Sequence, residues 1–172
     1  MSTMKTLLFL SLVVSAACAP SLAKVRQAQS ARYDGQFAEI WHEVREVVAE
    51  HYPAIKRADP ATGVLVTEWK LINRKAESQV RGTTSQAGLA HGGEYFQARI
   101  LVVPGGPPWR IVVQGEGAEH RRDFSMLVPY QRHHDEEPVW VQGRIDKLQL
   151  QIYERLSKRF PGGTSVATSA PR

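Results

Sequence analysis

The sequence predicts an α+β fold of two layers, in which an antiparallel sheet of four or five strands packs against an N-terminal helix and a long C-terminal helix. Apolar residues recur with a helical period over residues 35–52 and 138–160, and they alternate in two hairpins over 54–71 and 95–114. Without an apolar leader, about 150 residues remain, which suffices for one domain but not for two. We therefore expect a leader over residues 1–17, a flexible tether over 18–31, a single domain over 32–160 and a disordered tail over 161–172.

The leader has the layout of a secretory signal peptide. Lys5 gives it a positive start, and its apolar run over residues 7–14 is far shorter than the roughly 20 residues that span a bilayer. Two kinds of processing fit. Ordinary signal peptidase could cut near Ala17 or Ala19, or a lipoprotein peptidase could cut before Cys18.

Cys18 favours the lipoprotein alternative. The segment over residues 15–18 resembles a lipobox, although Ser15 stands where leucine is commonest. An exported protein with one cysteine has no intramolecular partner for it, so acylation explains Cys18 better than loss with the leader. Two or three acyl chains bind durably, whereas one binds marginally. Ala19 follows in place of aspartate, which by resemblance to enterobacterial sorting rules points to the outer membrane, facing the periplasm.

The first helix should begin at Asp34 or Gly35, after a short strand at 32–34, and should end before Pro53, which disfavours helical geometry in the preceding residue. Such a helix needs a sheet to cover its apolar stripe. The stripe comprises Phe37, Ile40, Trp41, Val44, Val47, Val48 and Tyr52, and the opposite, polar face comprises Glu39, Glu43, Arg45, Glu46 and Glu50.

The sheet is expected to contain two hairpins. Their strands span 54–58 with 64–71 and 95–103 with 109–114, joined by turns rich in Pro and Gly, and a further edge strand is expected at 124–128. Alternation places Leu65, Thr67, Trp69 and Leu71 on one face of the second strand and Glu68 and Lys70 on the other. The segment over residues 73–93, with an extended arm near 78–83, is long for a loop, so we expect it to be functional or mobile.

The last helix should begin at Glu136-Glu137-Pro138 and end at Phe160, before Pro161-Gly162-Gly163. Acidic residues at its start and Lys158 and Arg159 near its end complement the helix dipole. Its apolar positions are Val141, Ile145, Leu148, Ile152, Leu156 and Phe160.

No catalytic or metal-binding signature is present, so we expect no enzyme, cofactor or metal. Residues 133–137 are dense in metal-ligand types, but adjacent side chains diverge and cannot all reach one ion, which favours a solvated loop. Glu68 and Glu94 could meet across strands. A histidine-based hydrolase stays open as an alternative. The other residues considered, which lack the partners that nucleophilic or phosphate chemistry needs, are His42, His51, His91, His120, Ser85, Ser125 and Gly88 to Gly93.

The formal net charge of +5 comes from basic residues scattered among acidic ones, without a basic run, which argues against nucleic acid. The excess charge suits anionic lipid headgroups or an acidic partner. Trp41, Trp69, Trp109 and Trp140 fall one in each major element and are interpreted as core residues. The alternative is an apolar groove between the last helix and the sheet that takes a lipid or a peptide.

Residues 18–72 resemble lipoproteins of the BamC (NlpB) type and related bacterial lipoproteins. The resemblance rests on the lipobox, Tyr33-Asp34, the helix from Phe37 to Val48, and the segment from Asp59 to Trp69. It implies a helix-grip domain and a role beside the machinery that inserts β-barrel proteins into the outer membrane. BamC itself has two such domains, and its family has no catalytic residue to carry over.

These observations predict a non-enzymatic, lipid-anchored envelope protein that acts as an accessory or scaffold. Its partners would be the membrane, through acyl chains on Cys18, and an envelope protein that the sequence does not identify. The alternative function is a module that binds an apolar ligand between the sheet and the last helix. The sequence assigns no ligand-binding residue.

Overall fold

The computed structural model describes residues 21–74, 93–121, 126–130 and 138–160. Its helices are α1 (Leu22–Ser30), α2 (Phe37–His51) and α4 (Val139–Arg159). Its strands are β1 (Ile55–Asp59), β2 (Val64–Thr67), β3 (Lys70–Arg74), β4 (Gly93–Val103), β5 (Arg110–Arg121) and β6 (Met126–Pro129). The expected arm near 78–83 and the expected tail over 161–172 lie outside these residues.

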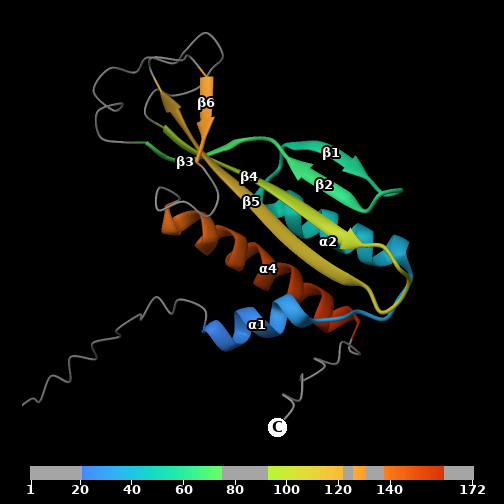
Figure 1. Ribbon diagram of the computed structural model, residues 1–172. Coiled ribbons are helices and arrows are strands. Elements are labelled where there is room, and N and C mark those ends of the chain that lie inside the picture. Colours follow the sequence, from blue (N-terminus) through green and yellow to red (C-terminus); the bar gives the residue numbers. More distant parts are fainter. Residues whose placement is uncertain (1–20, 75–92, 122–125, 131–137, 161–172) are drawn as a thin grey trace, which may run out of the picture.

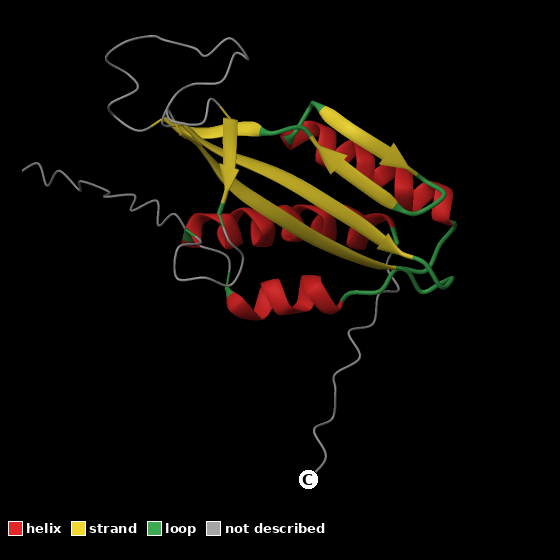
Figure 2. Cartoon of the chain, turned by 45° about the horizontal axis from the view of Figure 1, so that its top comes forward, coloured by secondary structure: helices red, strands yellow, loops and turns green. Residues whose placement is uncertain are grey.

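The strands form one antiparallel sheet with the order β1-β2-β4-β5-β6, and β3 pairs with the part of β4 that β2 leaves open. Helices α2 and α4 lie on one face of this sheet, and α1 lies beside α4 (Figures 1 and 2). The predicted two-layer α+β fold is confirmed. The described part of the chain has six strands where four or five were expected, because the strand predicted over 64–71 is divided into β2 and β3.

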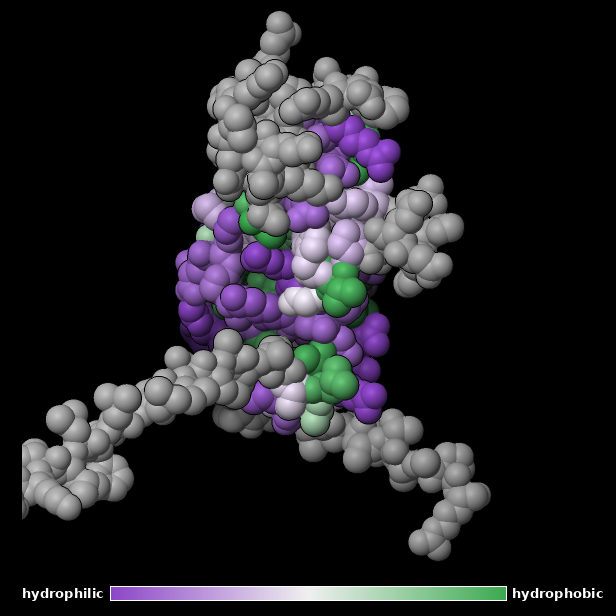
Figure 3. Space-filling model, turned by 90° about the vertical axis from the view of Figure 1, so that its left-hand side faces the viewer, coloured by the Kyte–Doolittle hydropathy of each residue, from purple (hydrophilic) through white to green (hydrophobic). Residues whose placement is uncertain are grey.

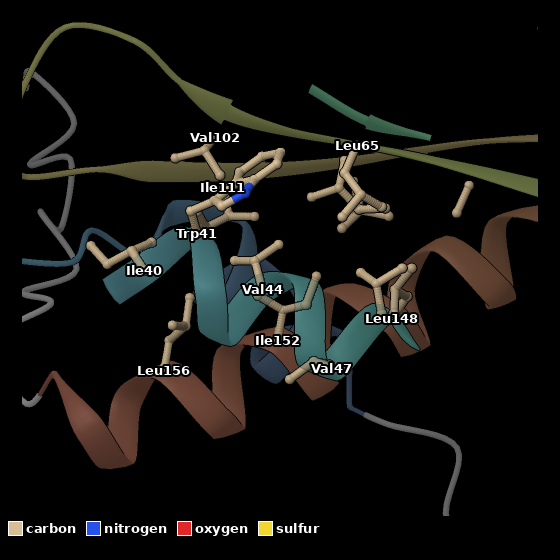
Figure 4. Close-up of a cluster of buried hydrophobic side chains, with 14 of the residues drawn as sticks. Ile40, Trp41, Val44, Val47, Leu65, Val102, Ile111, Leu148, Ile152 and Leu156 are labelled. Atoms are coloured by element: carbon tan, nitrogen blue, oxygen red, sulfur yellow. The ribbon is translucent and has the colours of Figure 1, made fainter. Parts of the chain in front are cut away.

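Apolar side chains of α2, α4 and the sheet meet in one core. Figure 4 shows Val44 and Val47 of α2 beside Leu148 and Ile152 of α4, beneath side chains of the sheet. One face of β4 contributes Phe96, Ala98, Ile100 and Val102 to this core, and all four are fully buried. Of the four tryptophans, Trp41 is buried in this core and Trp109 and Trp140 pack against it partly exposed, while Trp69 is half-buried outside it.

Several element boundaries differ from the prediction. Helix α2 begins at Phe37, with Gln36 at its N-cap, and not at Asp34 or Gly35. The strand expected at 32–34 is a single bridge between Tyr33 and Trp109. Helix α4 has no acidic residue in its first turn, and Glu136 and Glu137 lie outside the described residues. The predicted edge strand near 124–128 is present as β6.

The prediction of a flexible tether over residues 18–31 is wrong for residues 22–30, which form α1. The side chain of Ser21 caps this helix by accepting a hydrogen bond from the Lys24 N–H at 3.3 Å. Val25 and Ala28 are buried against Leu150 and Tyr153 of α4. Two apolar positions are too few to produce a visible helical period, which is why the sequence did not indicate this helix.

Gln149 of α4 closes the edge of β5 to which α1 docks. Its side-chain oxygen accepts a hydrogen bond from the Val113 N–H at 3.0 Å, and its side-chain nitrogen donates to the carbonyls of Ile111 and Ala28 at 3.2 and 3.1 Å. Strand β6 pairs only with residues 118–121 of β5, so the amide takes the place of a neighbouring strand here. Gln149 is 2% exposed, and it joins β5, α4 and α1.

Glu43 belongs to the interface between α2 and α4, although the sequence placed it on the polar face of the first helix. Its side chain is 7% exposed. It accepts a hydrogen bond from Arg159, and Arg155 lies 3.7 Å away and also pairs with Glu50. The prediction was wrong because α2 has two neighbours, the sheet and α4, and the second covers Glu43.

Replacing Glu43 with alanine should lower the free energy of unfolding by about 1–3 kcal/mol, because a buried, charge-assisted hydrogen bond is lost. Urea denaturation measures this change as a lower midpoint. The matched control is Glu46→Ala on the same helix, whose half-exposed carboxylate lies 4.0 Å from Arg45 and should contribute little. Equal midpoints for the two variants would contradict the role assigned to Glu43.

Candidate functional site

A pocket of about 200 Å³ opens between the C-terminal end of α2, the start of β3 and the first half of α4. Three of its lining residues are cationic, namely Lys70, Arg144 and Lys147, and none of the described residues that line it is acidic. Its other lining residues are His51, Tyr52, Leu148 and Gln151. We call these seven residues the basic pocket.

Lys70 reaches the basic pocket because of an irregularity between β2 and β3. Val66 lies opposite Arg99 and Lys70 lies opposite Phe96, so the chain advances four residues where β4 advances three. This extra residue, a β-bulge, moves the following side chains to the other face of the sheet. Lys70 therefore shares the helix-covered face with Phe96, whereas regular alternation had placed it on the opposite face.

The ammonium group of Lys70 is held in place by the end of α2. It donates a hydrogen bond to the carbonyl of His51 at 2.6 Å and lies 5.1 Å from the centre of the Tyr52 ring. A cation is favourable at the C-terminal end of a helix because it complements the helix dipole. The ammonium group of Lys70 thus stabilises the C-terminal end of α2 with one N–H donor, and its other two N–H donors can bind a group in the pocket.

Tyr52 joins the two sides of the basic pocket. Its ring packs against Phe96 of the core, with ring centres 5.7 Å apart, and its side chain is almost fully buried. Burial raises the pKa of Tyr52, and the nearby guanidinium of Arg144 lowers it by a smaller amount. Tyr52 therefore stays a neutral phenol at neutral pH, and its hydroxyl lies beside Arg144.

The α4 side of the pocket is one strip of the helix. Arg144, Lys147, Leu148 and Gln151 follow the three- and four-residue spacing that places side chains on one helix face. Leu148 is buried in the core, whereas Lys147 is exposed and Arg144 and Gln151 are half-buried. The strip thus runs along the border of the apolar face and turns its charged groups toward solvent.

Positive charge in the basic pocket is not balanced by its described neighbours. Among the described residues, no carboxylate forms an ion pair with Lys70, Arg144 or Lys147. Figure 3 shows the end of the molecule that faces left in Figure 1, where hydrophilic residues gather around a few hydrophobic ones. Chemically, the pocket can hold one small anionic group.

The residues singled out from the sequence are not brought together into one site. His51 lines the basic pocket, His42 is exposed on α2, and His120 is buried in β5. Cys18, the segment over residues 133–137, Ser85, Ser125 and His91 lie outside the described residues, as do all the glycines of the 88–93 segment except Gly93. No group of three or more His, Cys, Asp or Glu side chains suited to a metal ion occurs in the described part of the chain.

The sequence suggested that Glu68 and Glu94 meet across strands, but Glu94 faces a different carboxylate. Glu94 lies directly opposite Glu119 across β4 and β5, whereas Glu68 lies between β2 and β3 and does not face it. Burial raises the pKa of Tyr130 to about 12, and the charges of Glu119 and Glu94 add to this effect. Arg121 lies 3.8 Å from Glu119 and compensates part of its charge.

Comparisons with known proteins assign no family. No family model matches the chain, and no curated protein is similar to it. The resemblance to BamC-type lipoproteins therefore stays a prediction. Within the described ranges, no helix has both the length and the apolar composition to cross a bilayer.

Proposed function

We propose that the protein is a lipid-anchored component of the bacterial envelope, held in the outer membrane and facing the periplasm. It acts there as a non-enzymatic accessory or scaffold whose domain is held against the bilayer. The observation that carries this proposal is the short distance between the predicted anchor at Cys18 and α1, the first packed element of the domain.

Only three residues separate Cys18 from Leu22. Four peptide steps span at most about 14 Å even when fully extended. Because α1 is packed on α4 and β5, through Val25, Ala28 and the hydrogen bond from Gln149, it does not lengthen this link. An acylated Cys18 would therefore keep the whole domain beside the membrane surface, which suits a scaffold that works on membrane-bound partners.

The alternative, a module for an apolar ligand between the sheet and α4, finds less support. The described interface between these layers is occupied by core side chains such as Leu148, Ile152 and Ile100. The basic pocket, which opens beside it, is lined by cations and polar groups. Such a lining favours an anionic group over an acyl chain.

Replacing Cys18 with alanine should abolish incorporation of labelled palmitate and release the protein from the membrane fraction, because the thiol is the only acylation site of this kind in the chain. The measurement is autoradiography of fractionated cells. Ser15→Leu, which makes the lipobox more typical, is the matched control and should retain the label. Labelling that persists in Cys18→Ala would contradict acylation at Cys18.

A scaffold should also be recovered with other envelope proteins. Affinity purification from membranes dissolved in mild detergent tests this part separately. Recovery of the acylated protein alone, with no envelope protein in stoichiometric amount, would contradict the scaffold role while leaving the anchor intact.

A further inference from the structure

We propose that the basic pocket binds a phosphate group. Lys70 of β3 and Arg144 and Lys147 of α4 bring three positive charges to a space of about 200 Å³. In the described part of the chain no carboxylate compensates them. Like charges gathered around one recess repel one another, and an anion bound between them removes that repulsion.

The number and placement of donors favour phosphate over a carboxylate. The guanidinium of Arg144 presents a planar fork, whereas Lys70 and Lys147 act as point charges from two different elements. A carboxylate has two oxygens in one plane, so it satisfies the fork and leaves the lysines weakly engaged. A phosphate group offers several oxygens in a tetrahedral arrangement and can accept from all three side chains at once.

Two of the three cations are already positioned. The His51 carbonyl and the Tyr52 ring hold Lys70, and the Tyr52 hydroxyl lies beside the guanidinium of Arg144. Fixing these side chains before binding reduces the entropy that binding must overcome. The volume is below the 300–1,000 Å³ or so of pockets that enclose drug-sized ligands, so the pocket suits a single phosphate or a small headgroup that bears one.

The position of the pocket suggests where such a phosphate comes from. The pocket lies on the side of α4 that faces α2, and α1 packs on another side of the same helix (Figures 1 and 2). If Cys18 is acylated, as proposed above, the three-residue link to α1 keeps the domain, and with it the pocket, beside the lipid headgroups. A phospholipid headgroup and a free phosphate ion share the same chemistry, and the experiment separates them.

The first arm measures binding of inorganic phosphate to the purified full chain in non-ionic detergent. Titration calorimetry at constant ionic strength, with chloride replaced by phosphate, should give saturable binding, and acetate should bind at least tenfold more weakly. Lys147→Gln should weaken phosphate binding about tenfold, as expected for one lost charge-assisted hydrogen bond. Absence of saturable binding, or acetate binding as tightly as phosphate, would overturn the proposal.

The matched control is Lys158→Gln, which removes the same charge from an exposed position of the same helix outside the pocket. It should leave phosphate binding within about twofold, since a distant exposed charge is screened. An equal loss in Lys158→Gln and Lys147→Gln would show that net charge alone attracts phosphate, which contradicts a site. Lys147 is exposed, so its variant should keep the thermal midpoint of the parent protein, and Arg144→Lys then tests the need for the planar fork.

The second arm uses vesicles to distinguish a phospholipid headgroup from a free phosphate compound. Detergent-purified Cys18→Ala protein should bind vesicles of phosphatidylglycerol and phosphatidylcholine more tightly than vesicles of phosphatidylcholine alone, and Lys147→Gln should reduce this preference more than Lys158→Gln. That outcome supports a lipid headgroup. Phosphate binding in the first arm without any such preference supports a free phosphate compound. Because neither arm requires Cys18 to be acylated, both stand even if the anchor at Cys18 is disproved.

Discussion

Replacing Gln149 with leucine is expected to lower the free energy of unfolding by about 3 kcal/mol. The substitution keeps most of the side-chain volume but removes the partners of the Val113 N–H and of the Ile111 and Ala28 carbonyls. A buried polar group left without a partner costs about 1–3 kcal/mol. Since whole domains are stable by only about 5–15 kcal/mol, this loss is large. Urea denaturation monitored by tryptophan fluorescence measures it.

The same variant should loosen α1 before the rest of the domain unfolds, because Gln149 makes the buried hydrogen bond between α4 and α1, whereas the bond from Lys24 to Glu154 is exposed. Hydrogen exchange should become faster across Leu22–Ser30 than in α2. The control is Gln142→Leu, which alters an exposed glutamine of the same helix that bonds only to Asp146 and should change stability by less than about 0.5 kcal/mol. Similar losses in the two variants would contradict the edge-closing role of Gln149.

Alanine at Gly115 or Gly117 of β5 is expected to destabilise the domain by about 1–3 kcal/mol or more, because both glycines let α4 approach the sheet. A Cβ at Gly115 would lie 2.5 Å from Phe96 and 2.9 Å from Ile145, and one at Gly117 would lie 2.6 Å from Val141. Phe96 and Val141 are fully buried, so they cannot move aside without disturbing the core.

Gly143→Ala, in the same region, is expected to raise the stability of the domain. Nothing described lies within 4 Å of a Cβ at Gly143, which is in the interior of α4. Alanine should therefore stabilise the helix by about 0.5–1 kcal/mol. Thermal denaturation of the three single variants measures these changes in stability. A higher midpoint for Gly115→Ala or Gly117→Ala would contradict the close packing of α4 on β5.

Elements with one buried face were predictable from the sequence. Helix α2, the hairpin of β4 and β5, and helix α4 each place apolar residues at the period of their own secondary structure, so the pattern alone reveals them. The turn before Gly63, which has a φ of 67°, was also indicated by its Asp, Pro and Gly residues. These elements form the two layers.

The sequence pattern did not predict features that depend on contact with a second helix or on an irregular strand. Glu43 is polar in pattern but covered by α4, α1 has only Val25 and Ala28 to bury, and Lys70 changes face because of a bulge that local propensity does not show. The basic pocket depends on the last of these features, because Lys70 must reach the helix-covered face of the sheet to lie beside Arg144 of α4. A polar Gln149 among buried leucines was the one signal in the sequence that could have been followed.

Because residues 22–30 form the packed helix α1 and not a flexible tether, the proposed anchor would hold the domain close to the membrane. A long flexible tether would let the domain reach partners far from the membrane, whereas a link of three residues keeps it at the surface. A domain in that position, with three cations lining the basic pocket, suits contacts with phosphate-bearing lipids.

The mass of the intact mature protein, purified from bacterial envelopes in detergent, tests the proposed anchor most directly. We expect a chain that begins at Cys18, with the first 17 residues removed and the added mass of a diacylglyceryl group and a further acyl chain. A chain that begins at Ala19 or Pro20, or one that begins at Cys18 without added mass, would contradict it.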